Sequence, residues 1–387
     1  MTRLGQGIAG LVVVIAICKV SNGTAVFDSA IDTTSGVIAI ANLDQQIAQL
    51  RDEAGVEELL LVRSRFLADY EALDRASSLT EIRFEAPAEL LRRARTRSAL
   101  HRFADALADV AAAEHAGSNG DEIVALRSSI LVATGRAAEV IPQLEANLAR
   151  HPGFASRGAL AVAYAAIGRL DDADRLYVAA LADLDTTLPF PYAWIYFARG
   201  VMWAEQGGDE ARAQAMYVQA LAYLPEFVSA NIHLAELEVA RGDLTSAIER
   251  LDRIVRSSNE PEALGLLGGL HMRIGDRVRG EREVALAQQR FESLLAHDLL
   301  AFADHAAEFY LGLGADAPRA WELAQQNLAN RETDRAAALA VRAAEATGRY
   351  PDACALLLKY GSNSGGSLAM YLRSLDRQLA QLTPVNR

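Results

Sequence analysis

Apolar residues recur every three or four positions along most of the chain, which is the spacing of one face of an α-helix. Around Gly168 they form one run before the glycine and one run after it, at Leu160, Ala161, Tyr164, Ala173, Tyr177, Ala180 and Leu181. Glycine adopts the left-handed conformation that ends many helices without a steric penalty from a Cβ atom. The segment therefore predicts two helices joined by a tight turn.

The two-helix pattern repeats with a nearly constant period. Nine turn positions, spaced 33, 34, 33, 40, 34, 33, 40 and 33 residues apart, are Ala68, His101, Gly135, Gly168, Gly208, Gly242, Gly275, Ala315 and Gly348. Five positions after each turn stands an apolar residue, usually Ala or Gly: Leu73, Ala106, Val140, Ala173, Ala213, Ala247, Gly280, Ala320 and Ala353. Small residues at this position let paired helices approach closely. The period predicts an array of stacked helix pairs, in which chain length counts repeats.

The pattern resembles the tetratricopeptide repeat family. That family's 34-residue unit has a small residue at the turn, Ala at two close-packing sites, an aromatic residue between them and Pro at the end. The unit after Gly208 matches best, with Ala213, Tyr217, Ala220 and Pro225 in those roles. The resemblance implies an all-α, right-handed superhelical solenoid of about nine helix-turn-helix repeats over residues 55–360, of the kind found in bacterial exported members.

Ligands of the resembled family lie along the concave surface that the first helices form. Projected onto this chain, that surface is a predicted partner groove of small, apolar and a few charged residues. They are Ile195, Ala198, Met202, Glu205, Ile232, Glu236, Val239, Gly265, Gly269, Met272 and Arg273. Such a strip suits an extended or helical peptide better than a strongly charged polymer.

Two steps of 40 residues interrupt the period, and insertions in repeat arrays often gather on the binding face. The first step contains the aromatic segment with Phe190, Tyr192 and Trp194, which predicts either a surface patch for a partner or rings packed between helices. The second lies between Gly275 and Ala315, where the second helix of the unit is expected to extend to His297.

The ends of the chain differ from the array. An apolar stretch of 11 residues, from Ile8 to Cys18, follows Arg3 and precedes a small, polar segment. It predicts a signal peptide over residues 1–25, export to the periplasm and no membrane span after cleavage. Retention as an anchor and lipidation at Cys18 are the alternatives. Residues 26–54 are expected to form a linker and a degenerate opening helix.

The segment 361–367 is rich in Gly and Ser and predicts a hinge. Residues 368–387 predict an amphipathic helix that caps the last repeat, with a detachable partner-binding helix as the alternative.

Composition narrows the functional classes. The net charge of −12 and the single short basic cluster at residues 92–97 disfavour nonspecific binding to nucleic acid or to anionic membranes. Cleavage after Ala25 would leave Cys354 as the sole cysteine, so we expect no internal disulfide and interpret Cys354 as a small core residue.

The sequence contains no phosphate-binding Gly loop, Gly-x-Ser-x-Gly, Cys-x-x-Cys or His-Glu-x-x-His motif. The segment from Gly265 to Gly269 is expected to pack a helix closely. His305 and Glu308 share a helix face, but His297 lies too far along a helix to join them, so no third metal ligand is evident. We therefore predict no catalytic residues, cofactor or metal.

These observations favour a noncatalytic scaffold in the cell envelope that binds a protein or peptide partner. The alternative is a helical-repeat enzyme that acts on cell-wall or surface polysaccharide through a carboxylate pair. The 33–34-residue period disfavours it, because all-α toroidal enzymes of that kind have longer repeats.

Overall fold

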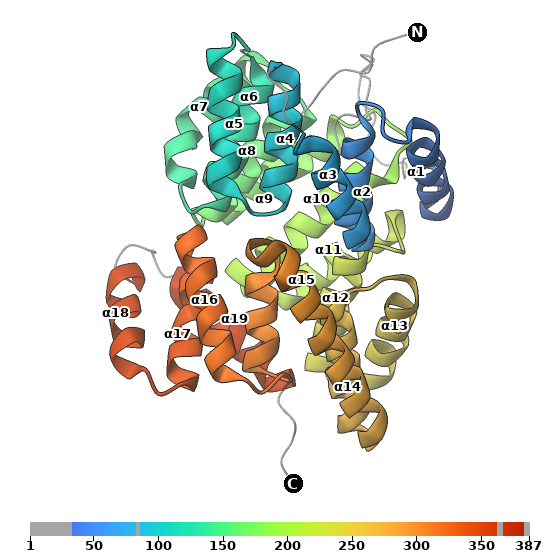
Figure 1. The fold of residues 1–387 in the computed structure, drawn as a ribbon, viewed down its shortest axis with the longest axis vertical. Helices are drawn as coiled ribbons and strands as arrows, with labels where there is room; N and C mark the ends of the chain where they lie inside the picture. The colour runs from blue at the N-terminus through green and yellow to red at the C-terminus, as the bar shows by residue number, and fades with distance from the viewer. Residues whose placement is uncertain (1–32, 83–85, 119, 362–366, 383–387) are drawn as a thin grey trace. The chain divides into compact units, whose positions relative to one another are not determined.

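The computed structural model describes residues 33–82, 86–118, 120–361 and 367–382. In these ranges every regular element is a helix, as Figure 1 shows, so the predicted all-α class is confirmed. The helices are α1 (Gly36–Leu50), α2 (Val56–Leu67), α3 (Tyr70–Thr80), α4 (Pro87–Ala99), α5 (Phe103–His115), α6 (Asp121–Ala133), α7 (Ala137–Arg150), α8 (Phe154–Ala166), α9 (Leu170–Ala182), α10 (Pro189–Val201), the π-helix η1 (Met202–Gln206), α11 (Glu210–Tyr223), α12 (Val228–Ala240), α13 (Leu244–Ser257), α14 (Pro261–Arg273), α15 (Arg277–Leu311), α16 (Ala317–Asn330), α17 (Asp334–Ala346), α18 (Tyr350–Gly361) and α19 (Ser367–Leu382).

The helices form two compact units. Unit 1 contains the described residues up to Gly200 together with Val218–Phe227, and unit 2 contains Val201–Tyr217 together with the described residues from Val228 onward. Within each unit, helices that follow one another in the sequence pack as neighbours, such as α8 with α9 and α14 with α15. This is the pairing that the repeat pattern predicts.

The turn positions have the predicted backbone conformation. All nine have a positive φ, from 48° at Ala315 to 95° at Gly275. The residues five positions after the turns are all buried, as their close-packing role requires. Three turn residues, Ala68, His101 and Ala315, keep a Cβ in the left-handed region, so the array tolerates local strain there.

In unit 1, the opening helices pack against the segment that contains the first insertion. The ring of Phe66 in α2 lies 5.2 Å from that of Phe190 and 4.8 Å from that of Phe227. Nearby, the Thr34 amide donates a hydrogen bond of 2.8 Å to the Thr187 carbonyl oxygen. These contacts join segments more than 120 residues apart in the sequence.

The predicted aromatic patch belongs to this core. Phe190, Tyr192 and Trp194 are all buried, so in this structure they do not present an exposed surface to a partner. The Tyr192 ring stacks on Tyr223 at 4.9 Å, and the Trp194 ring meets Tyr177 edge-on at 6.3 Å. The first insertion thus supplies rings that pack between helices, which was the alternative interpretation.

In unit 2, α14 and α15 approach each other closely at two glycines. A Cβ at Gly268 would lie 2.8 Å from the Gly280 carbonyl oxygen, and a Cβ at Gly280 would lie 2.5 Å from the Gly268 carbonyl oxygen. The close packing expected for the segment Gly265–Gly269 is therefore confirmed. Farther along, α15 kinks at Asp298, where φ is −135° and ψ is 64°, so its first part ends at His297 as predicted.

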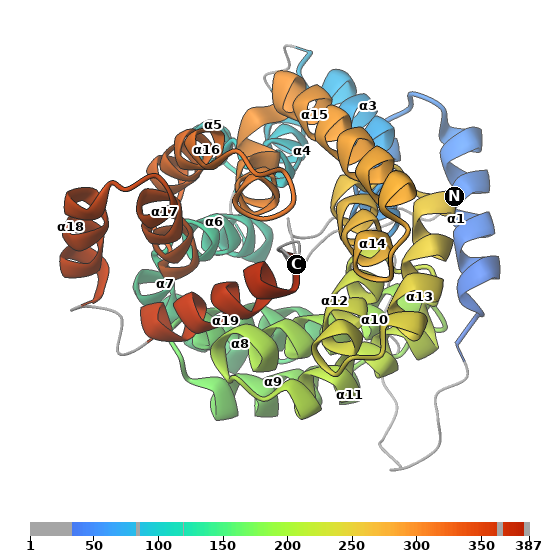
Figure 2. The same cartoon turned by 90° about the horizontal axis from the view of Figure 1, so that it is seen from below.

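The C-terminal helix α19 does not pack on α18 alone. It contacts α17 most extensively and also reaches η1 and α12. Figure 2 shows α19 running from beside α17 toward α12. An amphipathic helix is present here as predicted, and its apolar residues Leu368 and Leu375 are buried.

Two sequence predictions concern residues that the structure does not describe, and a third, on Cys354, is corrected by it. The signal segment 1–25 and most of the hinge 361–367 lie outside the described residues. Within the described ranges, no helix is both long and apolar enough to cross a bilayer. Cys354 is exposed, so its interpretation as a core residue is wrong: the neighbouring Ala353 occupies the packing position and turns Cys354 toward solvent.

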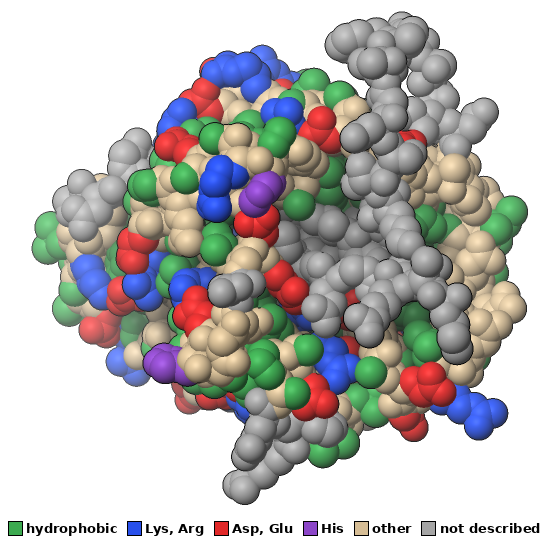
Figure 3. Space-filling model, turned by 90° about the horizontal axis from the view of Figure 1, so that it is seen from above, with side chains coloured by type: hydrophobic (Ala, Val, Ile, Leu, Met, Phe, Trp, Pro, Cys, Tyr) green, Lys and Arg blue, Asp and Glu red, His purple; other side chains and the backbone are tan. Residues whose placement is uncertain are grey.

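Surface charge is mixed. Figure 3 shows basic and acidic side chains interspersed over one face of the molecule. The basic cluster at residues 92–97 is likewise accompanied by acidic side chains. Arg93 and Arg97 both pair with Asp109, at 2.6 and 2.9 Å, and Arg97 also pairs with Glu81. These carboxylates neutralise part of the positive field that binding to a polyanion would need.

Candidate functional site

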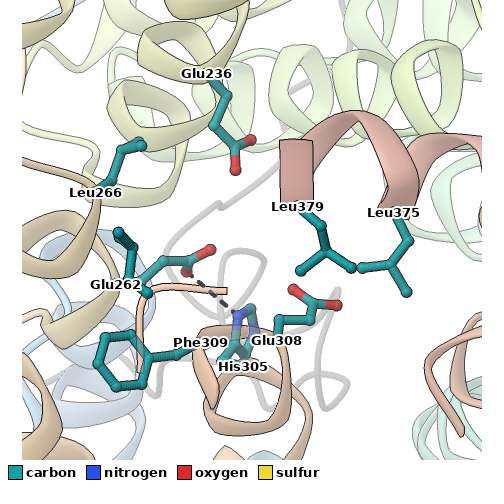
Figure 4. A pocket seen from close by; sticks show the side chains of 9 residues that line it. Glu236, Glu262, Leu266, His305, Glu308, Phe309, Leu375 and Leu379 are labelled. Atoms are coloured by element: carbon teal, nitrogen blue, oxygen red, sulfur yellow. Dashed lines mark ion pairs between the residues drawn. The ribbon is translucent and has the colours of Figure 1, made fainter. Parts of the chain in front are cut away.

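A pocket in unit 2 combines three carboxylates, one histidine and an apolar wall. It is lined by Glu236, Glu262, Leu266, His305, Glu308, Phe309, Leu313, Leu375 and Leu379. Figure 4 shows how the helices contribute: the acidic groups and His305 point inward from α12, α14 and α15, while Leu375 and Leu379 come from α19. The pocket is therefore walled by the first helices of three successive repeats and by the C-terminal helix.

Helix periodicity explains why these side chains meet. Glu262 stands thirteen positions before the turn residue Gly275, whereas His305 and Glu308 stand ten and seven positions before Ala315. Offsets that differ by three or four lie on the same face of a helix. Stacked first helices present this face side by side, so residues more than 40 positions apart converge.

Ion pairs order the polar side of the pocket. The His305 Nδ1 lies 3.3 Å from a Glu262 carboxylate oxygen, and its Nε2 lies 3.9 Å from the Asp304 carboxylate. Arg335 donates a hydrogen bond of 3.1 Å to Glu308 Oε1. Each acidic group thus faces a basic one, and the cluster extends across α14, α15 and α17.

These contacts and the burial shift the acidities strongly. The carboxylate of Asp304, helped by that of Glu262, raises the pKa of His305 to about 10. Burial raises the pKa of Glu308 to about 7, because the low-dielectric surroundings disfavour its charge. Burial also favours neutral Glu262, but the opposing charge of His305 prevails and lowers the pKa of that carboxyl.

A second, smaller cavity adjoins Glu308 and Leu375. Its other polar residues are Glu205, Arg335, Tyr371 and Ser374. Glu205 is the main reason that the pKa of Arg335 lies well above its usual value. Glu205 lies in η1, a π-helical turn of the kind that often re-aims side chains at functional sites. The next residue, Gln206, donates a 2.8 Å hydrogen bond from Nε2 to the Tyr371 hydroxyl.

The structure divides the predicted groove residues by burial. Six are buried and pack against other helices: Ile195, Met202, Ile232, Val239, Gly265 and Gly269. Four are half-buried, namely Ala198, Glu205, Glu236 and Met272, and Arg273 is exposed. Of the eleven, Glu236 lines the larger pocket and Glu205 lines the smaller one.

Sequence reasoning missed Glu262 as a neighbour of His305 and Glu308. The signal was available, because the groove positions include residues 13 and 10 positions before a turn, and these offsets select Glu262 before Gly275 and His305 before Ala315. The statement that no third candidate ligand accompanies His305 and Glu308 is therefore wrong, because a Glu262 donor atom from the preceding repeat lies within 4.8 Å of theirs.

Residues 205–270 match the family model described as a tetratricopeptide repeat. Over these residues the chain is similar to tetratricopeptide repeats. The matched segment includes the end of η1, all of α11, α12 and α13 and most of α14, which carry Glu205, Glu236 and Glu262 of the two cavities. The sequence-based resemblance is thus confirmed over residues 205–270.

Solved structures show similar helical arrangements at low sequence identity. The Cut9–Hcn1 hetero-tetramer of the APC/C is 17% identical with a TM-score of 0.46, and the match covers 88% of this chain and 66% of that one. A Rap protein complexed with competence and sporulation factor is 15% identical with a TM-score of 0.44, over 89% and 94% of the two chains. A thermophilic tetratricopeptide repeat protein of Thermus thermophilus is 21% identical with a TM-score of 0.37, over 52% and 98%. No curated protein matches the sequence.

Proposed function

We propose that this protein is a noncatalytic scaffold that binds an amphipathic helix of a protein partner. The binding surface is the face of unit 2 that the first helices of its repeats form. The observation that carries the proposal is the position of α19. That helix belongs to no repeat, and it lies against α17, α12 and η1. The face therefore already accommodates a helix, with contacts that define what a partner must offer.

The apolar contacts of α19 form one stripe. Leu368, Leu375 and the half-buried Leu372 recur at spacings of three to four residues, and Leu368 packs with Ala337 and Ala338 of α17. Small alanines on α17 permit this close approach, as ridge-into-groove packing requires. A partner helix would need large apolar side chains at the same spacing.

Polar contacts fix the orientation of α19. The Tyr371 hydroxyl accepts the hydrogen bond from Gln206, Asp376 pairs with Arg342 at 2.5 Å, and Arg377 lies 3.5 Å from Glu210. Ion pairs at the rim of an apolar contact add specificity more than affinity. A matching partner therefore carries charges of both signs beside its apolar stripe.

The charge pattern of the pocket favours binding over hydrolysis. A carboxylate pair for polysaccharide cleavage would need one free base or nucleophile beside one protonated acid. Burial raises the pKa of Glu308 to about 7, as such an acid requires, but neither carboxylate is free: Glu262 pairs with His305 and Glu308 pairs with Arg335. Leu375 and Leu379 border the same space and make it apolar on that side. We therefore place the function in partner binding and not in glycan turnover.

We also propose that the scaffold works in the cell envelope, on the support of the apolar stretch from Ile8 to Cys18 and the small residues that follow. A fusion of the full chain to a reporter that is active only outside the cytoplasm tests this. We expect reporter activity and recovery in the envelope fraction. Recovery in the cytoplasmic fraction would refute the export proposal while leaving the binding proposal intact.

Competition with the chain's own helix tests the binding proposal. The full chain serves as bait in an envelope extract, and a synthetic peptide of residues 367–382 is added in excess, with a scrambled peptide as control. A partner that uses the α19 face is displaced by the native peptide and retained with the scrambled one. In a parallel arm, Leu375→Asp in the bait weakens α19 docking and increases partner capture, whereas Arg373→Ala on the exposed side of α19 leaves capture unchanged.

Two results would contradict the proposal. One is specific capture that neither the native peptide nor Leu375→Asp alters, because the partner would then use another surface. The other is the absence of any specific partner together with measurable glycan turnover by the chain, which would favour the polysaccharide enzyme.

A further inference from the structure

Three side chains in the larger pocket carry the donor types that first-row divalent metal ions prefer. Glu262 comes from the first turn of α14, and His305 and Glu308 come from successive turns of α15. One donor atom from each residue lies within 4.8 Å of the other two. Imidazole nitrogen combined with carboxylate oxygen is typical of sites for Zn²⁺ and related ions.

The donor spacing is close to that of a coordination sphere. Tetrahedral Zn²⁺ with bonds of about 2.1 Å places neighbouring donor atoms about 3.4 Å apart. The Glu262 oxygen and His305 Nδ1 are 3.3 Å apart, and this contact is an ion pair without hydrogen-bond geometry. The Nδ1 atom is shielded from solvent, so it points into the cluster and not toward bulk water. A Glu308 carboxylate oxygen lies within 4.8 Å of both of these donor atoms.

Outer groups orient two of the three donors. Asp304 lies 3.9 Å from His305 Nε2, so it faces the ring nitrogen opposite the cluster. Arg335 holds Glu308 Oε1 at 3.1 Å. Carboxylate partners behind a histidine and hydrogen bonds behind a carboxylate are the usual supports of metal ligands.

We infer that Glu262, His305 and Glu308 bind one divalent first-row transition-metal ion, with Zn²⁺ as the expected species, and leave its remaining coordination position open toward the pocket. The inference goes beyond the scaffold function, because partner binding on the α19 face requires no ion. The ion would join α14 to the second part of α15 by coordinate bonds. It would therefore stabilise unit 2 in addition to any role at the open position.

Calorimetric titration of the full chain with Zn²⁺, after treatment with a chelator, tests the inference. All proteins carry Cys18→Ser and Cys354→Ser, because a free thiol could bind Zn²⁺ on its own. We expect one tight site per chain and at least about 100-fold weaker binding in His305→Ala, Glu262→Gln and Glu308→Gln. His297→Ala, which removes an exposed histidine from the same helix, leaves the tight site unchanged.

Two further measurements separate a ligand role from a structural one. Asp304→Asn keeps all three ligands and is expected to weaken Zn²⁺ binding by about 10–100-fold through the orientation of His305. X-ray absorption at the zinc edge is expected to show one imidazole and otherwise oxygen ligands. Circular dichroism checks that each variant keeps its helix content, and the isosteric Glu→Gln variants provide the comparison if His305→Ala unfolds.

Several outcomes would overturn the inference. One is the absence of tight Zn²⁺ binding by the chain. Equal loss of binding in His297→Ala, or sulfur ligation in the absorption spectrum, would place the ion elsewhere. Mg²⁺ binding as tight as that of Zn²⁺ would also contradict it, because Mg²⁺ disfavours imidazole. The partner-capture experiment has a separate readout, so either proposal can fail alone.

Discussion

Replacing Gly268 by Ala tests the close contact of α14 with α15 in unit 2. The new Cβ would lie 2.8 Å from the Gly280 carbonyl oxygen, 2.9 Å from a Val284 methyl carbon and 3.0 Å from the Val284 amide nitrogen. Two of these atoms belong to the backbone of α15, so they cannot turn away as a flexible side chain can. The helices must separate by about 0.5 Å, a gap that forfeits a substantial part of the dispersion attraction across a contact.

Two opposing terms set the size of the effect. Alanine in a helix interior is about 1 kcal/mol more favourable than glycine. Overpacking a tight contact costs about 1–3 kcal/mol, and a clash with backbone belongs at the upper end of that range. We therefore expect Gly268→Ala to lower the free energy of unfolding of unit 2 by about 2 kcal/mol.

The adjacent residue provides a matched control. The three heavy atoms nearest to a Cβ at Gly269 all belong to the side chain of Leu313, the closest at 3.0 Å, and that side chain can shift. Gly269→Ala gains the same helix propensity without a backbone clash, so we expect a change between 0 and about 1 kcal/mol in the stabilising direction. The difference between the two variants isolates the close approach of α14 to α15.

Hydrogen exchange measured on peptides of α14 and α15 is the suitable assay, because it reports stability by region. A single global unfolding curve would combine two compact units and would not be two-state. Gly268→Ala should speed exchange in these helices and leave unit 1 unchanged. If Gly268→Ala proves as stable as Gly269→Ala, the backbone contact at Gly280 does not exist as described.

Three further predictions concern other parts of the chain. Ala315→Gly should raise the stability of unit 2 by about 0.5–1 kcal/mol, because a Cβ at a φ of 48° is strained, and an unchanged or lower thermal midpoint would contradict this. Phe66→Ala should lower the free energy of unfolding of unit 1 by about 3–5 kcal/mol and speed hydrogen exchange in α2. Unaffected exchange would mean that the aromatic contacts of Phe66 to Phe190 and Phe227 are dispensable for stability. The hydrogen bond from Arg97 lowers the pKa of Glu81 from 4.5, so this pair stabilises the fold above that pH and the contribution is lost as the pH falls through the folded-state value. Glu81→Gln should therefore destabilise by less than about 1 kcal/mol at neutral pH and by nothing near pH 2 in urea unfolding, and an equal effect at both pH values would refute the role of the charge.

The fold could be predicted from the sequence where local chemistry decides the structure. A residue that ends one helix and starts the next within a few positions must adopt positive φ, and glycine marks such positions without knowledge of tertiary contacts. The residues five positions later are small because paired backbones approach there, as Gly280 shows. Both signals depend only on neighbours in the sequence, so their period was visible.

The site could be predicted only in part, because its members come from different repeats. Along the sequence Glu262 and Glu308 look like solvated residues on a helix surface, since most carboxylates are. What makes them neighbours is the stacking of first helices, and the second 40-residue step changes the sequence distance between equivalent positions. The exposure of Cys354 and the burial of the aromatic rings in the first insertion likewise depend on which helix face a neighbouring helix covers, and the sequence does not show this.

The second irregular step also explains why the charged cluster is held firmly. In most repeats a short loop separates one helix pair from the next, but α15 runs from Arg277 to Leu311 with non-helical angles only at Asp298. The helix that carries Asp304, His305 and Glu308 is therefore attached directly to the helix that packs on Gly268. Donor groups on packed helices keep their geometry better than donor groups on loops. A separation of α14 from α15, as Gly268→Ala would cause, should thus displace Glu262 from His305 and weaken the Zn²⁺ site, although Gly268 contributes no ligand. Gly269→Ala should leave Zn²⁺ affinity nearly unchanged, and equal affinities in the two variants would show that the helix contact and the ion site are independent.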